Sequence, residues 1–283
     1  MIYISASFLH SDLKKSLALL YTNEFRHIEL SGGFNYSNCI EADLMALKSE
    51  QNLSYRCHNY FPPAKEPFAL NMASLNDDVY QKTLSYFKEA IRLSKSLGSE
   101  KFSIHAGFYF DVTADDLGNT VTKRRLFHRG KCLKRFCDGF NSLKDFTEDI
   151  ELYIENSVIS SANLKAFNGE NIAMLTNYKE YIELKKNIDF KLLLDVGHLK
   201  VSSNSLGLAF DDELDKMMAV SDYLHISDNN SLFDEHKPLL ANSNLHKKLK
   251  GYNVKGKEIG FEMRAGITAI KNSYTIIKEM LND

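Results

Sequence analysis

Histidines and carboxylates follow a series of short apolar segments along this chain, where their side chains could act together. They are His58, His105, Glu155, Asp195, His225 and Glu262, with His198, Asp234 and His236 a few residues further along. Burying such groups costs free energy unless they are paired or bind a metal ion. Imidazole nitrogens and carboxylate oxygens are ligands that divalent ions accept. One histidine alone is more often a hydrogen-bonded core or surface residue, but this repetition along the chain predicts a metal site.

The apolar segments that precede these residues are predicted strands. They alternate with amphipathic stretches from one end of the chain to the other, as in repeated βα units. Eight strands are predicted: IYISA near Ile4, HIEL near Ile28, LSYRC near Tyr55, KFSIH near Ser103, ELYIE near Tyr153, KLLLD near Leu193, YLHIS near Leu224 and EIGFE near Gly260. A closed barrel and an open doubly wound sheet both fit this pattern. Because a barrel collects its active site at the carboxyl ends of its strands, the polar residues favour an α/β fold, a (β/α)8 TIM barrel formed by residues 1–283 as one domain.

Capping residues and periodicity predict the helices. Between the third and fourth strands, apolar residues recur at helical spacing after Asn76, a candidate N-cap, and before Gly98, a candidate stop. The last helix is predicted after Gly266, where an apolar stripe runs to Leu281. Eight helices are predicted in all, with one long connection from about Gly107 to Lys131.

The overall composition excludes several classes of protein. A content of 44% hydrophobic and 25% charged residues is typical of globular proteins, and no apolar run is long enough to cross a bilayer. The net charge of -2 argues against a globally basic nucleic-acid binder. The four cysteines have no CxxC spacing and are too sparse for a disulfide framework. Since the N-terminal MIYISASF lacks the features of a signal peptide, we expect a cytoplasmic protein with reduced cysteines and no membrane partner.

Six segments together resemble the motifs of the xylose isomerase-like superfamily of TIM barrels. They are RCHNYFPPAKEPFALNMAS, FSIHAGF, LYIENS, LLLDVGHLK, YLHISDNNSLFDEHKP and GFEM, in this order along nearly the whole chain. That superfamily includes sugar and sugar-phosphate isomerases and epimerases, sugar-acid dehydratases, and the DNA-repair enzyme endonuclease IV. The resemblance therefore implies a metal-dependent barrel enzyme without selecting its reaction.

For a sugar enzyme, the resemblance implies one divalent ion, Mn²⁺, Zn²⁺, Co²⁺ or Mg²⁺. Its ligands would be Glu155, Asp195, His225 and Glu262. The ion would stabilise an enediolate formed from a ketose, while the carboxylates of Glu155 and Glu262 remove and return the proton. His58, His105 and His198 are expected to contact the substrate, a small carbohydrate with or without a phosphate. We therefore expect a sugar or sugar-phosphate isomerase or epimerase.

Endonuclease IV supplies the alternative, a zinc-dependent phosphodiesterase acting on abasic DNA. Its three zinc ions have nine ligands, and the matching positions here are all filled, including His198, Asp234 and His236. The DEH triplet that begins at Asp234 also resembles a loop of many sugar-phosphate isomerase-like proteins, and Glu29 in IELSGG favours the sugar enzymes. A non-catalytic barrel is the third interpretation, because KPLLANSN replaces the glycine-rich turn that usually follows this triplet in the sugar enzymes.

Basic residues gather in two segments that could overlook the mouth of the barrel. The first holds Lys123, Arg124, Arg125, Arg129, Lys131, Lys134 and Arg135, and the second holds Lys247, Lys248, Lys250, Lys255 and Lys257. A DNA-repair enzyme would use many of them against backbone phosphates, whereas a sugar-phosphate enzyme would need one or two. Arg124 and Arg125 are candidates for binding a substrate anion. For most of the others, a solvated helix face is at least as good an explanation. The oligomeric state stays open.

Overall fold

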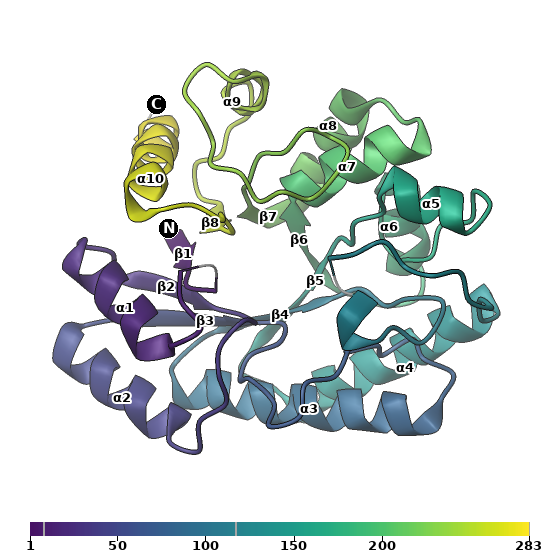
Figure 1. Ribbon diagram of the computed structural model, residues 1–283, viewed down its shortest axis with the longest axis horizontal. Coiled ribbons are helices and arrows are strands. Elements are labelled where there is room, and N and C mark those ends of the chain that lie inside the picture. Colours follow the sequence, from purple (N-terminus) through teal and green to yellow (C-terminus); the bar gives the residue numbers. More distant parts are fainter. Residues whose placement is uncertain (8, 117, 283) are drawn as a thin grey trace.

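Eight parallel strands close into a barrel in the computed structural model of this protein (Figure 1). The structure describes residues 1–7, 9–116 and 118–282. The strands are β1 (Ile2–Ser5), β2 (His27–Leu30), β3 (Ser54–His58), β4 (Lys101–His105), β5 (Glu151–Glu155), β6 (Lys191–Asp195), β7 (Ser221–His225) and β8 (Glu258–Phe261). Neighbouring strands follow chain order and β8 pairs with β1, so the predicted (β/α)8 barrel is confirmed and the open sheet is excluded.

Helices surround these strands on the outside of the barrel (Figure 1). They are α1 (Leu13–Thr22), α2 (Ile40–Gln51), α3 (Asp77–Ser96), α4 (Arg129–Phe146), α5 (Ser161–Ala166), α6 (Tyr178–Lys185), α7 (Val196–Leu206), α8 (Phe210–Val220), α9 (Asn244–Leu249) and α10 (Ile267–Asn282), with a short 3₁₀ helix η1 (Ala114–Asp116). The described residues therefore form ten α-helices rather than the predicted eight, because the connections after β5 and β6 each contain two. None of the described helices is long and apolar enough to cross a membrane.

Helix α3 illustrates how the local sequence sets the limits of an element. The Asn76 side chain accepts a hydrogen bond from the backbone amide of Asp78 at 3.0 Å, and so caps the helix as predicted. Asp77 and Asp78 lie in the first turn, where negative charge interacts favourably with the helix dipole. Just beyond the last turn, Gly98 has φ +73°, a conformation that glycine adopts without a steric penalty.

Side chains alternate between the two faces of each strand and so form two packed layers, one outside the barrel wall and one inside it. Leu152 and Ile154 of β5 belong to the main core, which lies between the strands and the helices. Tyr153 forms a separate small cluster with Leu193 and Tyr223 inside the barrel. Because side chains alternate along a strand, residues two positions from these three also point inward. Much of the interior is therefore polar or aromatic rather than filled by the branched aliphatic side chains that are usual in such barrels.

Long connections follow three strands, so the expectation of a single one was wrong. Residues 59–76 link β3 to α3 and residues 226–243 link β7 to α9, in addition to the predicted connection after β4. Both added connections bury apolar side chains, among them Phe61, Leu70 and Leu239, so they pack into the core without regular structure. All four cysteines are free, as expected.

Candidate metal centre

Four side chains from strands β5 to β8 meet at the carboxyl end of the barrel. Glu155, Asp195 and His225 are the last residues of β5, β6 and β7, and Glu262 directly follows β8. Each offers one ligand atom, and these four atoms all lie within 4.8 Å of one another. All four residues are buried. The structure thus brings together the four positions predicted to hold a single divalent ion.

Several of the converging atoms are buried without a hydrogen bond of normal geometry to the described residues. They are both carboxylate oxygens of Glu155, Oδ2 of Asp195 and Nδ1 of His225, although imidazole nitrogens lie 2.8 Å from Oε2 and 3.3 Å from Oε1 of Glu155. Buried polar atoms in folded proteins almost always have a partner, so a cluster of exceptions needs an explanation. A divalent cation at the point where these atoms converge would supply that partner, and carboxylate and imidazole are suitable donors. The residues present therefore fit a divalent metal ion.

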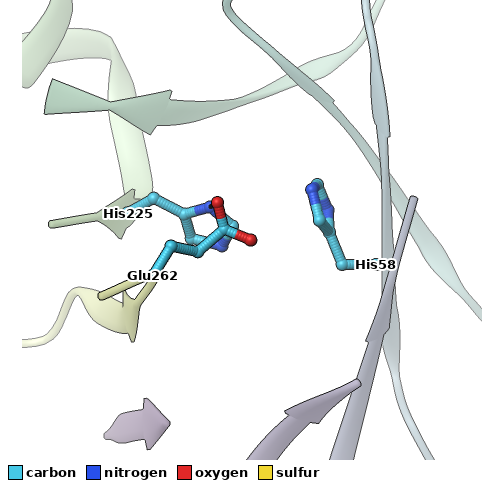
Figure 2. A group of neighbouring side chains, drawn as sticks. All are labelled: His58, His225 and Glu262. Atoms are coloured by element: carbon cyan, nitrogen blue, oxygen red, sulfur yellow. Dashed lines mark ion pairs between the residues drawn. The ribbon is translucent and has the colours of Figure 1, made fainter. Parts of the chain in front are cut away.

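His58 and His105 extend the cluster toward β3 and β4. The Nε2 atoms of His58 and His105 lie 2.8 Å and 2.9 Å from the same oxygen, Oε2 of Glu155. The two Nε2 atoms lie 3.3 Å apart. His58 also groups with His225 and Glu262 as a further set of three ligand atoms, and Figure 2 shows these three side chains reaching toward one another from facing parts of the barrel wall.

A third group lies beside the first two. Oδ2 of Asp234 lies 3.1 Å from Nε2 of His198 and 3.0 Å from Nε2 of His236. The segment after β7 returns on itself through paired backbone hydrogen bonds between Asp228 and Lys237, both 2.8 Å. That return brings Asp234 and His236 back to the cluster. All nine histidine and carboxylate positions predicted for a metal site are therefore close to one another in space.

The outer nitrogens of three histidines are held by neutral groups. Nδ1 of His58 lies 2.6 Å from the Ser103 hydroxyl. Nδ1 of His198 donates to the backbone carbonyl of Asn156 at 2.9 Å, and Nδ1 of His236 donates to that of Glu262 at 3.2 Å. Such contacts fix the tautomer and the ring orientation, so that Nε2 is presented to the cluster.

The charges in the cluster shift its pKa values strongly. Burial raises the pKa of Glu155, but the imidazoles of His105 and His58 outweigh it and hold this pKa well below its usual range. Burial is the dominant effect at Asp195 and raises its pKa to about 6. For His225, burial lowers the pKa, but the carboxylates of Glu29 and Glu155 more than compensate and hold it well above its ordinary value. Glu155 and His225 therefore stabilise each other's charged forms, whereas burial favours the neutral form of Asp195.

Of the two arginines predicted to bind a substrate anion, Arg124 is already paired within the chain. The Arg124 guanidinium donates to both carboxylate oxygens of Asp116, at 2.6 Å and 2.9 Å, and to the carbonyl of Asp111 at 3.0 Å. Arg125 is exposed. Three more pair with carboxylates of this chain: Arg129 with Glu180, Lys134 with Asp138 and Arg135 with Asp77. Anion binding by Arg124 and Arg125 thus stays a prediction, and for Arg124 it would compete with an existing ion pair.

Some residues that shape the cluster were not predicted from the sequence. The Asn156 side chain bonds to the backbone of Asp195, accepting from its amide at 2.7 Å and donating to its carbonyl at 3.0 Å. Glu29 was noted only as a feature of sugar enzymes, but its carboxylate lies 3.0 Å from Nε2 of His225. The available signal was the two-residue alternation of the strands, which places Glu29 on the inner face of β2.

The chain resembles known proteins over most of its length. A family model described as a xylose isomerase-like TIM barrel matches residues 18–280. The uncharacterized protein MJ1311 of Methanocaldococcus jannaschii is 26% identical over 228 residues, covering 76% of this chain and 68% of that protein. A solved structure of a D-tagatose 3-epimerase-like protein matches with a TM-score of 0.73 at 20% identity, covering 99% of this chain and 97% of that one. Endonuclease IV from Thermus thermophilus matches with a TM-score of 0.59 at 14% identity, covering 99% and 98%.

These similarities differ in what they establish. At 20% and 14% identity, the two solved structures show a shared fold, and one is related by name to a sugar enzyme while the other is a nuclease. They therefore do not select a reaction. The family model extends from α1 to α10 and spans β2 to β8, so it includes every strand that contributes to the cluster. The chain belongs to the xylose isomerase-like TIM-barrel family.

Proposed function

We propose that this protein is a divalent-metal-dependent isomerase or epimerase that acts on a sugar or sugar phosphate. The observation that carries the proposal is the convergence of four buried candidate ligands, Glu155, Asp195, His225 and Glu262, several of whose atoms have no hydrogen bond of normal geometry to the described residues. A set of three carboxylates and one imidazole suits Mn²⁺, Mg²⁺ or Co²⁺, and Zn²⁺ also accepts these ligands.

The same residues suit proton transfer next to a carbonyl group. A bound divalent ion would polarise the carbonyl of a ketose and stabilise the negative charge of an enediolate. Glu155 and Glu262 are the proposed acid and base, which remove and return the proton. They come from β5 and β8, which are separated by β6 and β7 around the barrel, and so can approach a substrate from different sides. His58, His105 and His198 would contact substrate hydroxyls.

Replacing one of the two carboxylates tests this assignment. We expect Glu262→Gln to reduce turnover by about 10²-fold or more, because a base and a metal ligand are lost while the side-chain volume is nearly unchanged. Turnover is measured on ketoses and their phosphates with Mn²⁺ present, and thermal unfolding checks the fold. Glu258→Gln, on the same strand at the other end of the barrel, is the matched control and should stay active. Near-normal activity of Glu262→Gln would contradict the proposed role, and an inactive wild-type protein would contradict the proposed reaction.

The alternative is a phosphodiesterase of the endonuclease IV type, which would use three zinc ions on abasic DNA. The observation in its favour is that His58, His105, His198, Asp234 and His236 also join the cluster. The ion pairs of Arg124, Arg129 and Arg135 within the chain count against it, because they make these three cations less available for backbone phosphates.

Counting metal ions per chain distinguishes these two functions. About one ion, especially manganese, is expected for the sugar enzyme, and about three zinc ions for the phosphodiesterase. Asp234→Ala should leave the metal content and turnover nearly unchanged if the site holds one ion, and should lower both severely if it holds three. A protein that takes up neither Mn²⁺ nor Zn²⁺ would contradict both functions and support a non-catalytic barrel.

A further inference from the structure

A buried carboxylate lies against His225 on the side away from the proposed metal ligands. Glu29 of β2 has no exposed surface, and its Oε2 lies 3.0 Å from Nε2 of His225. The other ring nitrogen of His225, Nδ1, lies 3.3 Å from Oε1 of Glu155. The imidazole is therefore held between a carboxylate of the cluster and a carboxylate outside it. The proposed function uses the first of these two groups and leaves the second unexplained.

Tyr223 holds Glu29 from a second direction. Its hydroxyl donates to the same oxygen, Oε2 of Glu29, and the side chain is buried. The other oxygen, Oε1, is buried without a hydrogen-bond partner among the described residues. A fully buried carboxylate is costly for stability, because protein groups must replace its hydration. A carboxylate kept at this position despite that cost indicates a role beyond packing.

Gly260 of β8 provides the space for this contact. It lies opposite His225 in the pairing of β7 with β8. A Cβ atom at this position would lie 2.7 Å from Cδ2 and 2.9 Å from Nε2 of His225, and 3.3 Å from Oε2 of Glu29. Any larger residue would have to push the ring and the carboxylate apart. Residues from three strands, β2, β7 and β8, therefore meet at the hydrogen bond between Glu29 and His225.

The hydrogen-bond partner of Nε2 of His225 differs in charge from the partners of Nδ1 in three other histidines. Nδ1 of His58, His198 and His236 bonds to a hydroxyl or a backbone carbonyl, and a carboxylate oxygen, Oε1 of Glu155, lies 3.6 Å from that of His198. A carboxylate is a stronger acceptor than either group, and it makes the imidazole a better metal ligand as well as fixing its orientation. The inner nitrogen also differs, since His225 presents Nδ1 to the cluster where these three present Nε2.

We infer that Glu29 is a positioning residue for the metal centre. It accepts a hydrogen bond from Nε2 of His225 and so makes Nδ1 the ligand atom, while Tyr223 holds the carboxylate and Gly260 leaves room for the pair. Glu29 acts through His225 and contacts neither the ion nor the substrate. This inference rests on the proposed metal centre, and it adds a residue that the ligand set does not contain.

Two substitutions of Glu29 separate orientation from packing. In Glu29→Gln, the amide oxygen can still accept from His225 and Tyr223, so the affinity for Mn²⁺ should stay within about tenfold of wild type. In Glu29→Ala, no acceptor remains, and the affinity should fall by about 10- to 100-fold. Affinity is measured by competition with a chelating dye. The visible absorption spectrum of the Co²⁺-loaded protein reports ligand geometry, and it should change in Glu29→Ala and resemble wild type in Glu29→Gln.

Glu258→Ala is the matched control, because it removes a carboxylate from β8 at the opposite end of the barrel. It should lower stability through the loss of its ion pair with Arg56 without changing the Mn²⁺ affinity or the Co²⁺ spectrum. If Glu29→Ala does not fold, Tyr223→Phe takes its place, with an expected loss of a few-fold in affinity.

The outcomes separate this inference from the proposed function. Wild-type affinity and an unchanged Co²⁺ spectrum in Glu29→Ala, or in Tyr223→Phe if that variant is needed, would overturn the positioning role and leave the metal centre standing. Equal losses in Glu29→Gln and Glu29→Ala would also overturn it, since a neutral acceptor should suffice for orientation. A wild-type protein that binds none of these ions would overturn the proposed function and the positioning role together.

Discussion

Asp195 shows how one residue can stabilise the fold and prepare the site. Its Oδ1 accepts a hydrogen bond from the backbone amide of His198 at 2.6 Å and so caps α7. Its Oδ2 is buried without a hydrogen-bond partner among the described residues, and Asp195 belongs to the group of four candidate metal ligands. The cap fixes the carboxylate through the start of a helix, so the free oxygen needs little further ordering when a cation binds. Capping and metal binding are therefore compatible at this position.

The close approach around Gly260 leads to a prediction at the scale of one methyl group. We expect Gly260→Ala to lower the Mn²⁺ affinity, because the added Cβ would displace His225 and Glu29. We also expect it to lower the free energy of unfolding by about 1–3 kcal/mol, as overpacking a close-packed interior does. Mn²⁺ titration and urea unfolding of the metal-free protein measure the two effects.

The control for this prediction is Gly266→Ala, where an added Cβ would meet no heavy atom of the described residues within 4 Å. That variant should keep the wild-type Mn²⁺ affinity. The same affinity in Gly260→Ala and wild type would mean that the ring and carboxylate can shift without disturbing the centre, contrary to the tight arrangement described here.

At the scale of elements, the strands were predictable because each is a short apolar run, and six of them, β3 to β8, end at or just before a histidine or carboxylate. All eight predicted strands are present, and α3 and α10 begin where their capping and glycine signals placed them. The second helix in each of the connections after β5 and β6 was not predicted separately. One of the helices in these connections, α5, has only six residues, too few to repeat an amphipathic pattern. Residues 59–76 carry buried apolar side chains but no regular structure, so periodicity could not identify that connection as long.

The positions of the candidate ligands were predictable, whereas the contacts that orient them were not. A strand end is a local feature of the sequence, and closing the barrel brings all such ends together. Glu29 and His225 are 196 residues apart, on strands that are not neighbours in the sheet, so only the closed barrel brings them into contact. The Arg124–Asp116 pair was missed for another reason, since it depends on the conformation of an irregular loop.

The cap of α3 gives a prediction for a single element. Replacing Asn76 with alanine removes the acceptor for the amide of Asp78, and we expect the free energy of unfolding to fall by about 1 kcal/mol. Ser85→Ala, at an exposed position in the same helix, is the control and should be neutral or slightly stabilising, since alanine has the higher helix propensity. Urea unfolding measures both variants. A loss in Ser85→Ala as large as that in Asn76→Ala would show that the effect does not come from the cap.

At the scale of the whole molecule, the apolar core and the charged groups lie in different parts of the barrel. The main apolar core lies between the strands and the helices, while the carboxyl end of the barrel holds the cluster of candidate metal ligands. At the opposite end, both carboxylate oxygens of Glu258 accept from Arg56, at 3.2 Å and 3.1 Å, and Lys101 lies 3.2 Å from one of them. In barrels of this kind, the amino-terminal end of the strands serves stability rather than catalysis. The two charged ends should therefore respond independently to mutation.

The network at Glu258 predicts how stability depends on pH. Burial raises the pKa of Glu258, but Arg56 and Lys101 outweigh it and hold this pKa below its ordinary value. A carboxylate whose pKa is lowered by folding contributes stability above its unfolded pKa of about 4.3, and this contribution is lost as the pH falls through the folded value. We expect Glu258→Gln to lower the free energy of unfolding by about 1–3 kcal/mol at pH 7. The difference from wild type should shrink as the pH is lowered below about 4.

Comparing the two proteins isolates this contribution, because the other carboxylates titrate equally in both. Urea unfolding of the metal-free wild type and Glu258→Gln between pH 7 and pH 3 gives the difference at each pH. Asp138→Asn is the control, since Asp138 forms an exposed pair with Lys134 and its replacement should change stability little at any pH. A difference for Glu258→Gln that stays constant down to pH 3 would mean that the variant acts through packing. The ionised carboxylate would then not be what joins β3, β4 and β8 at this end of the barrel.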